Sequence, residues 1–126
     1  MATVVTKEER RDFSRIALHR PATIEVGGVK VPCALLDISL CGALVRVPHA
    51  LHAVQEQGCA LVIRLDHGIE TIRMRGVVAH RKDDTIGIRC REVDLDGIAH
   101  LRRLLEVNLG DEVLLHRELA ALVRRR

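Results

Sequence analysis

The chain has 126 residues, of which 48% are hydrophobic and 29% charged, and this composition predicts one globular domain rather than a disordered or fibrous chain. Phe13 is its one aromatic residue, which excludes RNA-binding modules that stack bases on several aromatic side chains. A net charge of +3 falls short of the basic bias expected of a protein that binds duplex nucleic acid.

The N-terminal segment, residues 1–20, is predicted to be a flexible arm. Charged residues are dense from Lys7 to Asp12, no apolar periodicity is present, and Pro21 disfavours a helix at the end of the segment. The segment lacks the apolar stretch of a signal peptide. No run in the chain approaches the roughly 20 apolar residues of a membrane-spanning helix. The sequence therefore predicts a cytoplasmic protein.

Residues 21–126 are predicted to form the folded domain. From residue 22 to 91, apolar side chains alternate with polar ones, which is typical of β-strands. The predicted inward-facing positions are Ile24 and Val26; Val29, Val31 and Cys33; Leu61, Ile63 and Leu65; Ile72 and Met74; and Ile86, Ile88 and Cys90. Gly27-Gly28 predicts a two-residue hairpin, and turns are expected at 66–68 and 83–84. Five or six strands with such short loops predict a small antiparallel β-barrel, closed or nearly closed, which hides the sheet edges.

After Val93 the apolar period changes to that of a helix. Its predicted apolar stripe consists of Leu95, Ile98, Leu101 and Leu105. Asp94 or Asp96 can cap the start, and residues 108–110 supply a stop. A second helix is expected after Asp111, with Leu115, Leu119 and Leu122 on its apolar face. The predicted organisation is therefore arm, barrel and C-terminal helices.

Residues that could support catalysis or bind a metal are few. The four cysteines, Cys33, Cys41, Cys59 and Cys90, form no C-x-x-C pair, which favours buried thiols over a zinc site or a redox couple. Among the seven histidines, the only close pair, His49 and His52, has no further ligand candidates beside it. The chain contains no G-x-S-x-G, H-E-x-x-H or Gly-rich phosphate loop. We therefore expect a binding protein without a cofactor or metal, and not an enzyme.

An arginine cluster lies at the junction between the arm and the barrel. Arg10 and Arg11 stand side by side, and Arg11 and Arg15 form the pattern R-x-x-x-R. The planar guanidinium pairs bidentately with a phosphate or with the O6/N7 edge of guanine, and it can also stack on a purine. A guanine nucleotide would use both properties. The alternative is a solvated charge cluster on a flexible segment.

A second pattern, D-x-S-x-x-G, is formed by Asp37, Ser39 and Gly42 at the end of a predicted strand. In an extended segment Asp37 and Ser39 share one face, while Ile38 and Leu40 point into the core. A carboxylate accepts hydrogen bonds from the N1 and N2 donors of guanine, a hydroxyl bonds a phosphate or base, and glycine allows a close backbone approach. The alternative is an ordinary turn in which Asp37 and Ser39 bond the neighbouring backbone.

Together and in this order, the two patterns resemble the PilZ domain family of bacterial cyclic di-GMP receptors. Further similarity to small single-domain members is found in residues 9–16, 93–96, 100–104, 108–112 and 117–120. The resemblance implies a mainly β fold: a six-stranded antiparallel barrel with C-terminal α-helices, over which the flexible arm folds when ligand binds. It also implies that Arg11 and Arg15 grip guanine and phosphate, with Asp37, Ser39 and Gly42 lining the facing barrel surface.

The resemblance gives expectations for two more residues. In this family the residue before R-x-x-x-R tends to decide between one ligand and two stacked ligands, and an arginine there, as Arg10 is, goes with two. After the fifth strand, close relatives carry an aromatic side chain that stacks on guanine, and this chain has His80. Because His80 follows the parity of Ile72 and Met74, an uninterrupted strand would point it into the core and a bulge would point it outward. A structural histidine is the alternative.

The sequence thus predicts a second-messenger receptor that binds cyclic di-GMP and relays arm ordering to an unidentified downstream protein. We expect a monomer, with no nucleic-acid or membrane partner. One alternative is a degenerate PilZ-type adaptor that binds proteins but no nucleotide. Another is a weak nucleic-acid-binding barrel, whose affinity would fall steeply with salt whatever the base.

Overall fold

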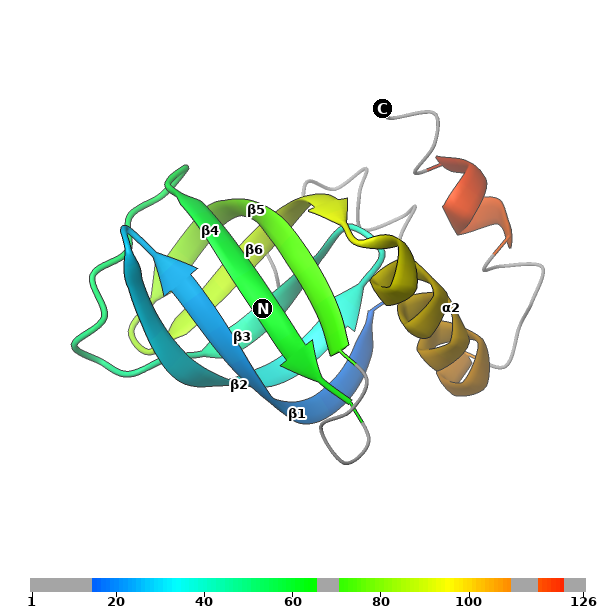
Figure 1. Cartoon of the computed structure of the whole chain (residues 1–126), viewed down its shortest axis with the longest axis horizontal. Helices are drawn as coiled ribbons and strands as arrows, with labels where there is room; N and C mark the ends of the chain where they lie inside the picture. The colour runs from blue at the N-terminus through cyan, green and yellow to red at the C-terminus, as the bar shows by residue number, and fades with distance from the viewer. Residues whose placement is uncertain (1–14, 66–70, 110–115, 122–126) are drawn as a thin grey trace.

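The computed structural model describes residues 15–65, 71–109 and 116–121. Six strands and one long helix follow each other along the chain (Figure 1). They are β1 (Ile16–Val26), β2 (Val29–Ser39), β3 (Gly42–Arg46), β4 (Gly58–Arg64), β5 (Thr71–Lys82), β6 (Thr85–Val93) and α2 (Leu95–Leu109). A short helical segment covers residues 116–121.

The strands form a closed barrel in the order β1-β2-β3-β6-β5-β4, and all neighbouring pairs are antiparallel. This confirms the predicted six-stranded antiparallel barrel. The hairpin between β1 and β2 turns at Gly27 and Gly28, whose φ angles of 59° and 82° suit glycine in a tight two-residue turn. The turn between β5 and β6 lies at residues 83–84, as expected, while the turn expected at 66–68 lies outside the described residues.

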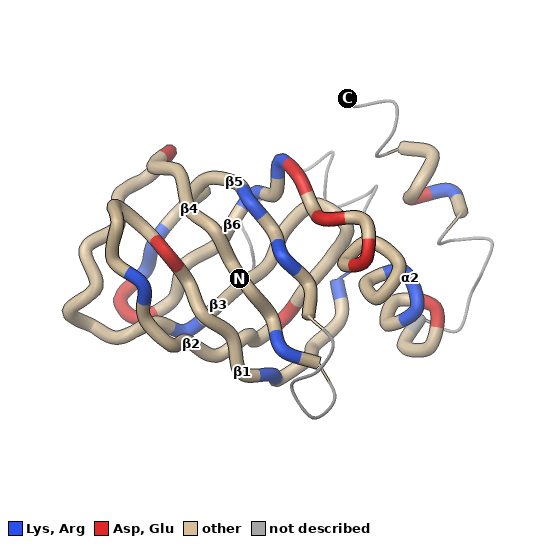
Figure 2. Tube along the Cα trace, in the orientation of Figure 1, with Lys and Arg blue, Asp and Glu red and all other residues tan. Residues whose placement is uncertain are grey.

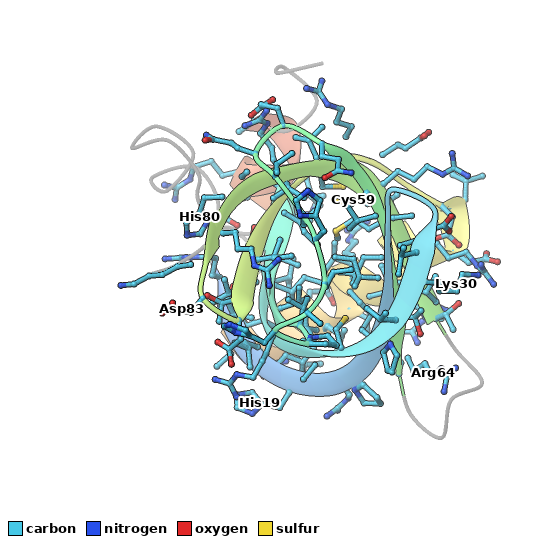
Figure 3. The ribbon with its side chains drawn as sticks, turned by 90° about the vertical axis from the view of Figure 1, so that its left-hand side faces the viewer. His19, Lys30, Cys59, Arg64, His80 and Asp83 are labelled. Carbon is cyan, nitrogen blue, oxygen red and sulfur yellow. The ribbon has the colours of Figure 1, made fainter. Side chains whose placement is uncertain are left out.

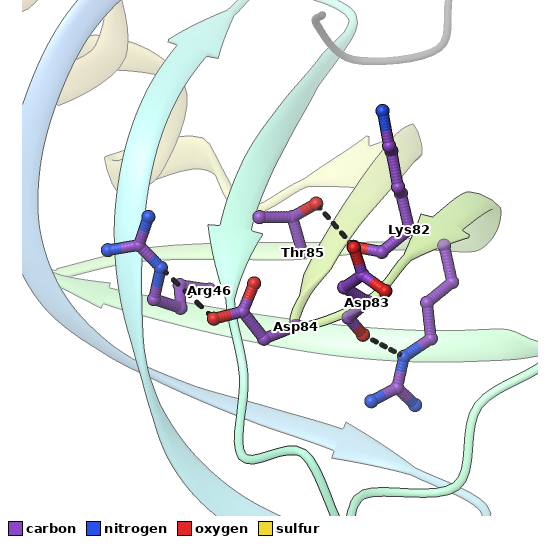
Figure 4. A network of polar contacts seen from close by, with 6 residues as sticks. Arg46, Lys82, Asp83, Asp84 and Thr85 are labelled. Carbon is purple, nitrogen blue, oxygen red and sulfur yellow. Dashed lines mark hydrogen bonds and ion pairs between the residues drawn. The ribbon is translucent and has the colours of Figure 1, made fainter.

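Polar contacts hold the turn between β5 and β6 (Figure 4). The hydroxyl of Thr85 donates a hydrogen bond to the Lys82 carbonyl at 2.9 Å, and Arg46 forms an ion pair with Asp84 at 3.5 Å. The φ angle of Asp83 is 54°, a left-handed conformation that Asp tolerates better than most residues. This local network fixes the pairing register of the hairpin at its turn.

The first strand begins earlier than the sequence indicated. Residues 16–20 were predicted to belong to the arm, but Ile16 is buried and pairs with Ile38 of β2. An irregularity between Ala17 and Arg20 shifts the register before the strand continues. Pro21 has no N–H to donate to a neighbouring strand. In the described structure β4 pairs with β1 only from Ala22 onward, so no hydrogen bond to β4 is lost at Pro21. Residues 1–14 lie outside the described part.

The core fills the barrel with the side chains that the alternation pointed inward. Ile24, Ile63, Ile72 and Ile86 are fully buried. Val29 departs from the prediction with 52% exposure, because it directly follows the hairpin turn at the barrel rim. The four cysteines carry no disulfide: Cys41 and Cys59 are buried and Cys33 and Cys90 half-buried. Burial raises the pKa of the Cys33 thiol to about 12 and that of Cys59 to about 11, so both thiols stay protonated at neutral pH.

Helix α2 packs against β5 and β1 at one end of the barrel (Figure 1). Leu101 and Leu105 are fully buried, as the helical stripe predicted, and Ile98 is half-buried. Leu95 departs from the prediction with 88% exposure, although Gly97 in the same turn is buried. The carbonyl of Asp94 accepts the Ile98 N–H at 2.9 Å, and its carboxylate accepts the N–H of Arg73 on β5 at 3.0 Å. Asp94 therefore starts the helix and ties that start to the sheet.

The C-terminal segment 116–121 is helical and buries Glu118 and Ala121. Leu119 packs against the core, as predicted, whereas Leu115 and Leu122 lie outside the described residues. None of the helices in the described ranges is long and apolar enough to cross a membrane.

Candidate functional site

The pairing register brings Asp37 and His80 into one row across four strands. Asp37 of β2 pairs with Leu44 of β3, Leu44 with Gly87 of β6, and Gly87 with His80 of β5. The row spans three strand spacings, or about 14 Å. It lies on the outside of the barrel, because the chain neighbours Ile38, Ala43, Val45, Ile86 and Ile88 fill the inside. Gly87 has no side chain, so the row is low next to His80, while Leu44 covers the position next to Asp37.

A second row runs beside the first. Ser39 pairs with Gly42, Gly42 with Arg89, and Arg89 with Val77. We call the surface formed by the two rows the motif face. It consists of Asp37, Ser39, Gly42, Leu44, Val77, His80, Gly87 and Arg89. Three residues of the predicted D-x-S-x-x-G pattern therefore share one surface with the predicted His80.

Asp37 is half-buried, and its Oδ1 atom has no hydrogen-bond partner among the described residues. Burial raises the pKa of its carboxyl, and the nearby positive charge of Arg15 opposes that rise. Arg15 directly precedes Ile16, which pairs with Ile38, so the register places Arg15 beside the end of the D-x-S-x-x-G strand. Asp37 Oδ1 is itself buried, and a buried acceptor without a donor is a candidate contact for a ligand that supplies one.

Ser39 shapes the turn between β2 and β3. Its side chain is 1% exposed, and its hydroxyl oxygen accepts the N–H of Cys41 at 3.2 Å and lies 3.3 Å from the Cys41 sulfur. The turn that was kept as an alternative is therefore formed by Ser39, though not by Asp37. Gly42 is required by close packing, since a Cβ there would collide with the carbonyl oxygen of Ile88.

A β-bulge sets the orientation of His80. Val78 pairs with Ile88 and His80 with Gly87, so Ala79 has no partner and the parity of β5 changes at that point. Val78 and Ala79 are buried while the imidazole is half-buried on the outer face, on the side opposite Lys30 and Arg64 (Figure 3). This is the bulged alternative of the sequence analysis. Burial, together with the charge of Lys82, lowers the pKa of His80, so its imidazole is neutral at pH 7.

The Nδ1 atom of His80 is buried and has no hydrogen-bond partner among the described residues. A neutral imidazole can use one ring nitrogen as donor and the other as acceptor. The motif face therefore holds two polar atoms without a bond from the described protein, one at each end of the row that joins Asp37 to His80.

Of the seven predicted site residues, five are placed by the structure. Arg15, Asp37, Ser39 and Gly42 gather at one end of the motif face, and His80 lies across it. Arg10 and Arg11 lie outside the described residues. Among the described residues, no cluster of His, Cys, Asp or Glu is suited to a metal ion.

Sequence reasoning missed Arg89 and Glu56. Arg89 lies in the second row, and its Nη2 atom lies 3.0 and 3.2 Å from the carboxylate oxygens of Glu56. Arg89 falls between Ile88 and Cys90 of an alternating strand, so its outward direction was readable. Its ion-pair partner was not, because 33 residues separate the two.

A groove of about 620 Å³ lies on a different surface, the outside of β1, β4 and β5. We call this surface the groove face. It is lined by Thr23, Glu25, Lys30, Ala60, Val62, Arg64, Arg73, Arg75, Glu92 and Asp94, together with parts of Leu61, Met74 and Val93. Figure 2 shows its basic positions along β5, with acidic positions where β6 leads into α2. None of the five predicted ligand residues that the structure describes lines it.

Comparison with known proteins gives one family and several similar solved structures. The family description "PilZ domain" matches residues 9–107. The Bacillus subtilis inhibitor of motility, MotI/DgrA, superimposes with a TM-score of 0.66 at 20% identity over 82% of this chain and 53% of that chain. This chain thus spans about half the length of MotI/DgrA. The PilZ domain of CeSA from a cellulose-synthesizing bacterium superimposes with a TM-score of 0.57 at 17% identity, covering 78% of this chain and 99% of that one.

Proposed function

Because the chain belongs to the PilZ domain family of cyclic di-GMP receptors, we propose that it binds cyclic di-GMP on the motif face. The observation that carries the proposal is the placement of Arg15 beside the D-x-S-x-x-G strand, where Asp37 offers an oxygen without a partner among the described residues. These two residues come from the two sequence patterns that led to the family. They supply a cation for the ligand and an acceptor for its base.

Each residue has a distinct role in this proposal. The Arg15 guanidinium pairs with a phosphate or with the O6/N7 edge of guanine, and Arg11 does the same from the arm. The Asp37 carboxylate accepts from the N1 and N2 donors of guanine. Gly42 lets β3 lie close to β6, and Ser39 fixes the turn that presents this glycine. Charge-assisted contacts of this kind contribute about 1.5–3 kcal/mol each, which is enough for micromolar or tighter binding after the arm is ordered.

We further propose that two stacked ligands bind, as Arg10 implies by resemblance. His80 lies about 14 Å from Asp37 along the row, so a single guanine base cannot contact both residues and His80 would contact a different base. The half-buried, neutral imidazole offers a flat face on which a guanine can stack. An imidazole stacks more weakly than an indole, so this contact contributes little to affinity.

Signal output in this proposal comes from the arm. Ligand binding selects a docked arm and so reshapes the surface that a downstream protein recognises. The structural likeness to an inhibitor of motility supports an output directed at a partner protein, although it leaves the partner of this chain open. Cytoplasmic location and a monomeric receptor belong to the same proposal.

Calorimetric titration of the full chain with cyclic di-GMP, GTP and a single-stranded oligonucleotide, each at two salt concentrations, tests the proposal. We expect saturable binding of cyclic di-GMP with about two ligands per chain, and much weaker binding of GTP. Equal binding of all three with a steep salt dependence would indicate a nucleic-acid-binding barrel instead. No heat with any of them would indicate an adaptor that binds no nucleotide.

A further inference from the structure

Arg89 occupies the centre of the motif face. It pairs with Gly42 on one side and Val77 on the other, and it follows Gly87 by two residues on the same side of β6. Gly42 and Gly87 have no side chains, so the guanidinium of Arg89 is the one cation that the described part of this face places between Asp37 and His80. Its side chain is 33% exposed, and it is therefore accessible to a bound molecule.

Glu56 holds this guanidinium through a single nitrogen. Both short contacts, at 3.0 and 3.2 Å, come from Nη2 of Arg89, so the pair lacks the fork geometry in which two nitrogens meet two oxygens. The Glu56 side chain is 56% exposed. Exposed ion pairs of this kind are weak, so a ligand with better geometry can displace the carboxylate.

The backbone fixes Glu56 next to the same face. Its φ angle of 70° is a left-handed conformation that is rare for glutamate. Its N–H donates to the Val78 carbonyl at 2.7 Å, and the Val78 N–H donates to the Gln57 carbonyl at 2.9 Å. The loop before β4 is thereby fastened to β5 immediately before the bulge that turns His80 outward. The carboxylate is held where it meets Arg89 across β5.

We propose that Arg89 is a further anion-contacting residue of the cyclic di-GMP site and that Glu56 restrains it until ligand binds. The proposal rests on the proposed function. A dianionic ligand lying between Asp37 and His80 covers the position of Arg89 and competes with the carboxylate of Glu56 for its guanidinium. Glu56 therefore lowers the affinity for the ligand by occupying Arg89.

Calorimetry of variants tests whether Arg89 leaves Glu56 to bind the ligand. We expect Arg89→Ala to weaken binding of cyclic di-GMP about tenfold or more, since it removes a charge-assisted contact. Glu56→Gln keeps the size of the side chain but removes its charge, and we expect it to strengthen binding about two- to fivefold. Because Glu56 acts through Arg89, the double variant should bind like Arg89→Ala alone.

The ion pair of Arg102 and Glu106 on α2, at 3.5 Å, supplies the matched controls. Arg102→Ala and Glu106→Gln make the same changes of charge and should leave affinity unchanged, while circular dichroism checks that every variant is folded. If the wild-type protein binds but Arg89→Ala binds equally well, the inference is wrong and the proposed function stands. Weaker binding by Glu56→Gln would also overturn it, since Glu56 would then contact the ligand directly. Absence of binding by the wild type would remove the proposed function and the inference with it.

Discussion

The motif face and the groove face belong to the same barrel but are built differently. On the groove face the β1–β4 and β4–β5 pairings run without a register shift, and opposite charges pair across strands, as Lys30 with Glu25 and Arg75 with Glu92. The β5–β6 pairing shifts register between Arg75 and Gly76, at the border of this face. On the motif face, the β2–β3 and β5–β6 pairings contain bulges, at Leu36 and Ala79. The bulges turn Asp37 and His80 into positions that regular strands would not give them. Asp37 and His80 carry their unpartnered polar atoms on the motif face, whereas the groove of about 620 Å³ lies on the groove face.

The largest expected effect is on affinity for cyclic di-GMP, which should depend on residues of the motif face and not on those of the groove face. Arg15→Ala or Asp37→Ala should weaken binding of cyclic di-GMP about 100-fold or more, because each removes charge-assisted hydrogen bonds to the ligand. Arg73→Ala, an exposed arginine that lines the groove face, should bind like the wild type. Calorimetry measures all three. Loss of binding in Arg73→Ala with retention in Arg15→Ala would reverse the roles of the two faces.

Two glycines of the barrel differ in how closely their surroundings are packed. A Cβ at Gly42 would collide with the Ile88 carbonyl, whereas a Cβ at Gly58 on β4 has no neighbour within 4 Å. We expect Gly42→Ala to lower the free energy of unfolding by about 1–3 kcal/mol. Gly58→Ala should leave it unchanged or raise it by about 0.4–1 kcal/mol, because alanine restricts the unfolded chain. Urea unfolding monitored by circular dichroism measures both changes, and equal stability of the two variants would contradict the packing described here.

The carboxyl of Asp37 should make stability depend on pH in a defined direction. Burial raises its pKa in the folded state above the unfolded value, so the charged form is disfavoured by folding. At pH 7, Asp37→Asn should therefore unfold at a higher temperature than the wild type. The difference should shrink as the pH falls through the raised folded-state pKa, where the wild-type carboxyl becomes neutral. Thermal unfolding of both proteins from pH 7 to pH 3 measures this difference in unfolding temperature. If the difference grows on acidification, the charged form of Asp37 stabilises the fold and the expectation is wrong.

The smallest expected effect is at His80. Its replacement by Ala removes one weak stacking contact, so affinity for cyclic di-GMP should fall no more than about tenfold. His80→Trp should bind more tightly than the wild type, since an indole stacks better on guanine. His19, an exposed residue of β1, supplies the control, and His19→Ala should not change the affinity measured by the same titration. Unchanged binding in all His80 variants would assign the imidazole a structural role.

Periodicity in the sequence predicted most of the barrel and little of the site geometry. Ile24, Ile63, Ile72 and Ile86 showed which way the strands face, and the Gly27-Gly28 pair predicted the hairpin correctly because a left-handed turn favours glycine. The bulges at Leu36 and Ala79 leave no mark in the local sequence, since they arise from how two strands pair. The direction of His80 could therefore only be given as two alternatives.

The other differences between prediction and structure also arise from contacts between segments that are separate in the sequence. Ile16 belongs to the barrel because it pairs with Ile38 of β2. The dense charges before Ile16 in the sequence give no indication of this pairing. The Glu56–Arg89 pair depends on a loop fastened to Val78 of β5, a contact that the sequence around Glu56 does not indicate. The motifs named Arg15, Asp37, Ser39 and Gly42, but only strand register brings them onto one surface with His80.

A titration of ¹⁵N-labelled protein with cyclic di-GMP, followed by amide chemical shifts, tests the central claim most directly. We predict large changes at Asp37, Gly42, Gly87 and Arg89, with His80 affected at the far end of the row. The amide chemical shifts of Ala60, Val62 and Arg73 on the groove face should not change. Shifts concentrated on the groove face, or spectra unchanged at saturating ligand, would contradict the assignment of the motif face as the nucleotide site.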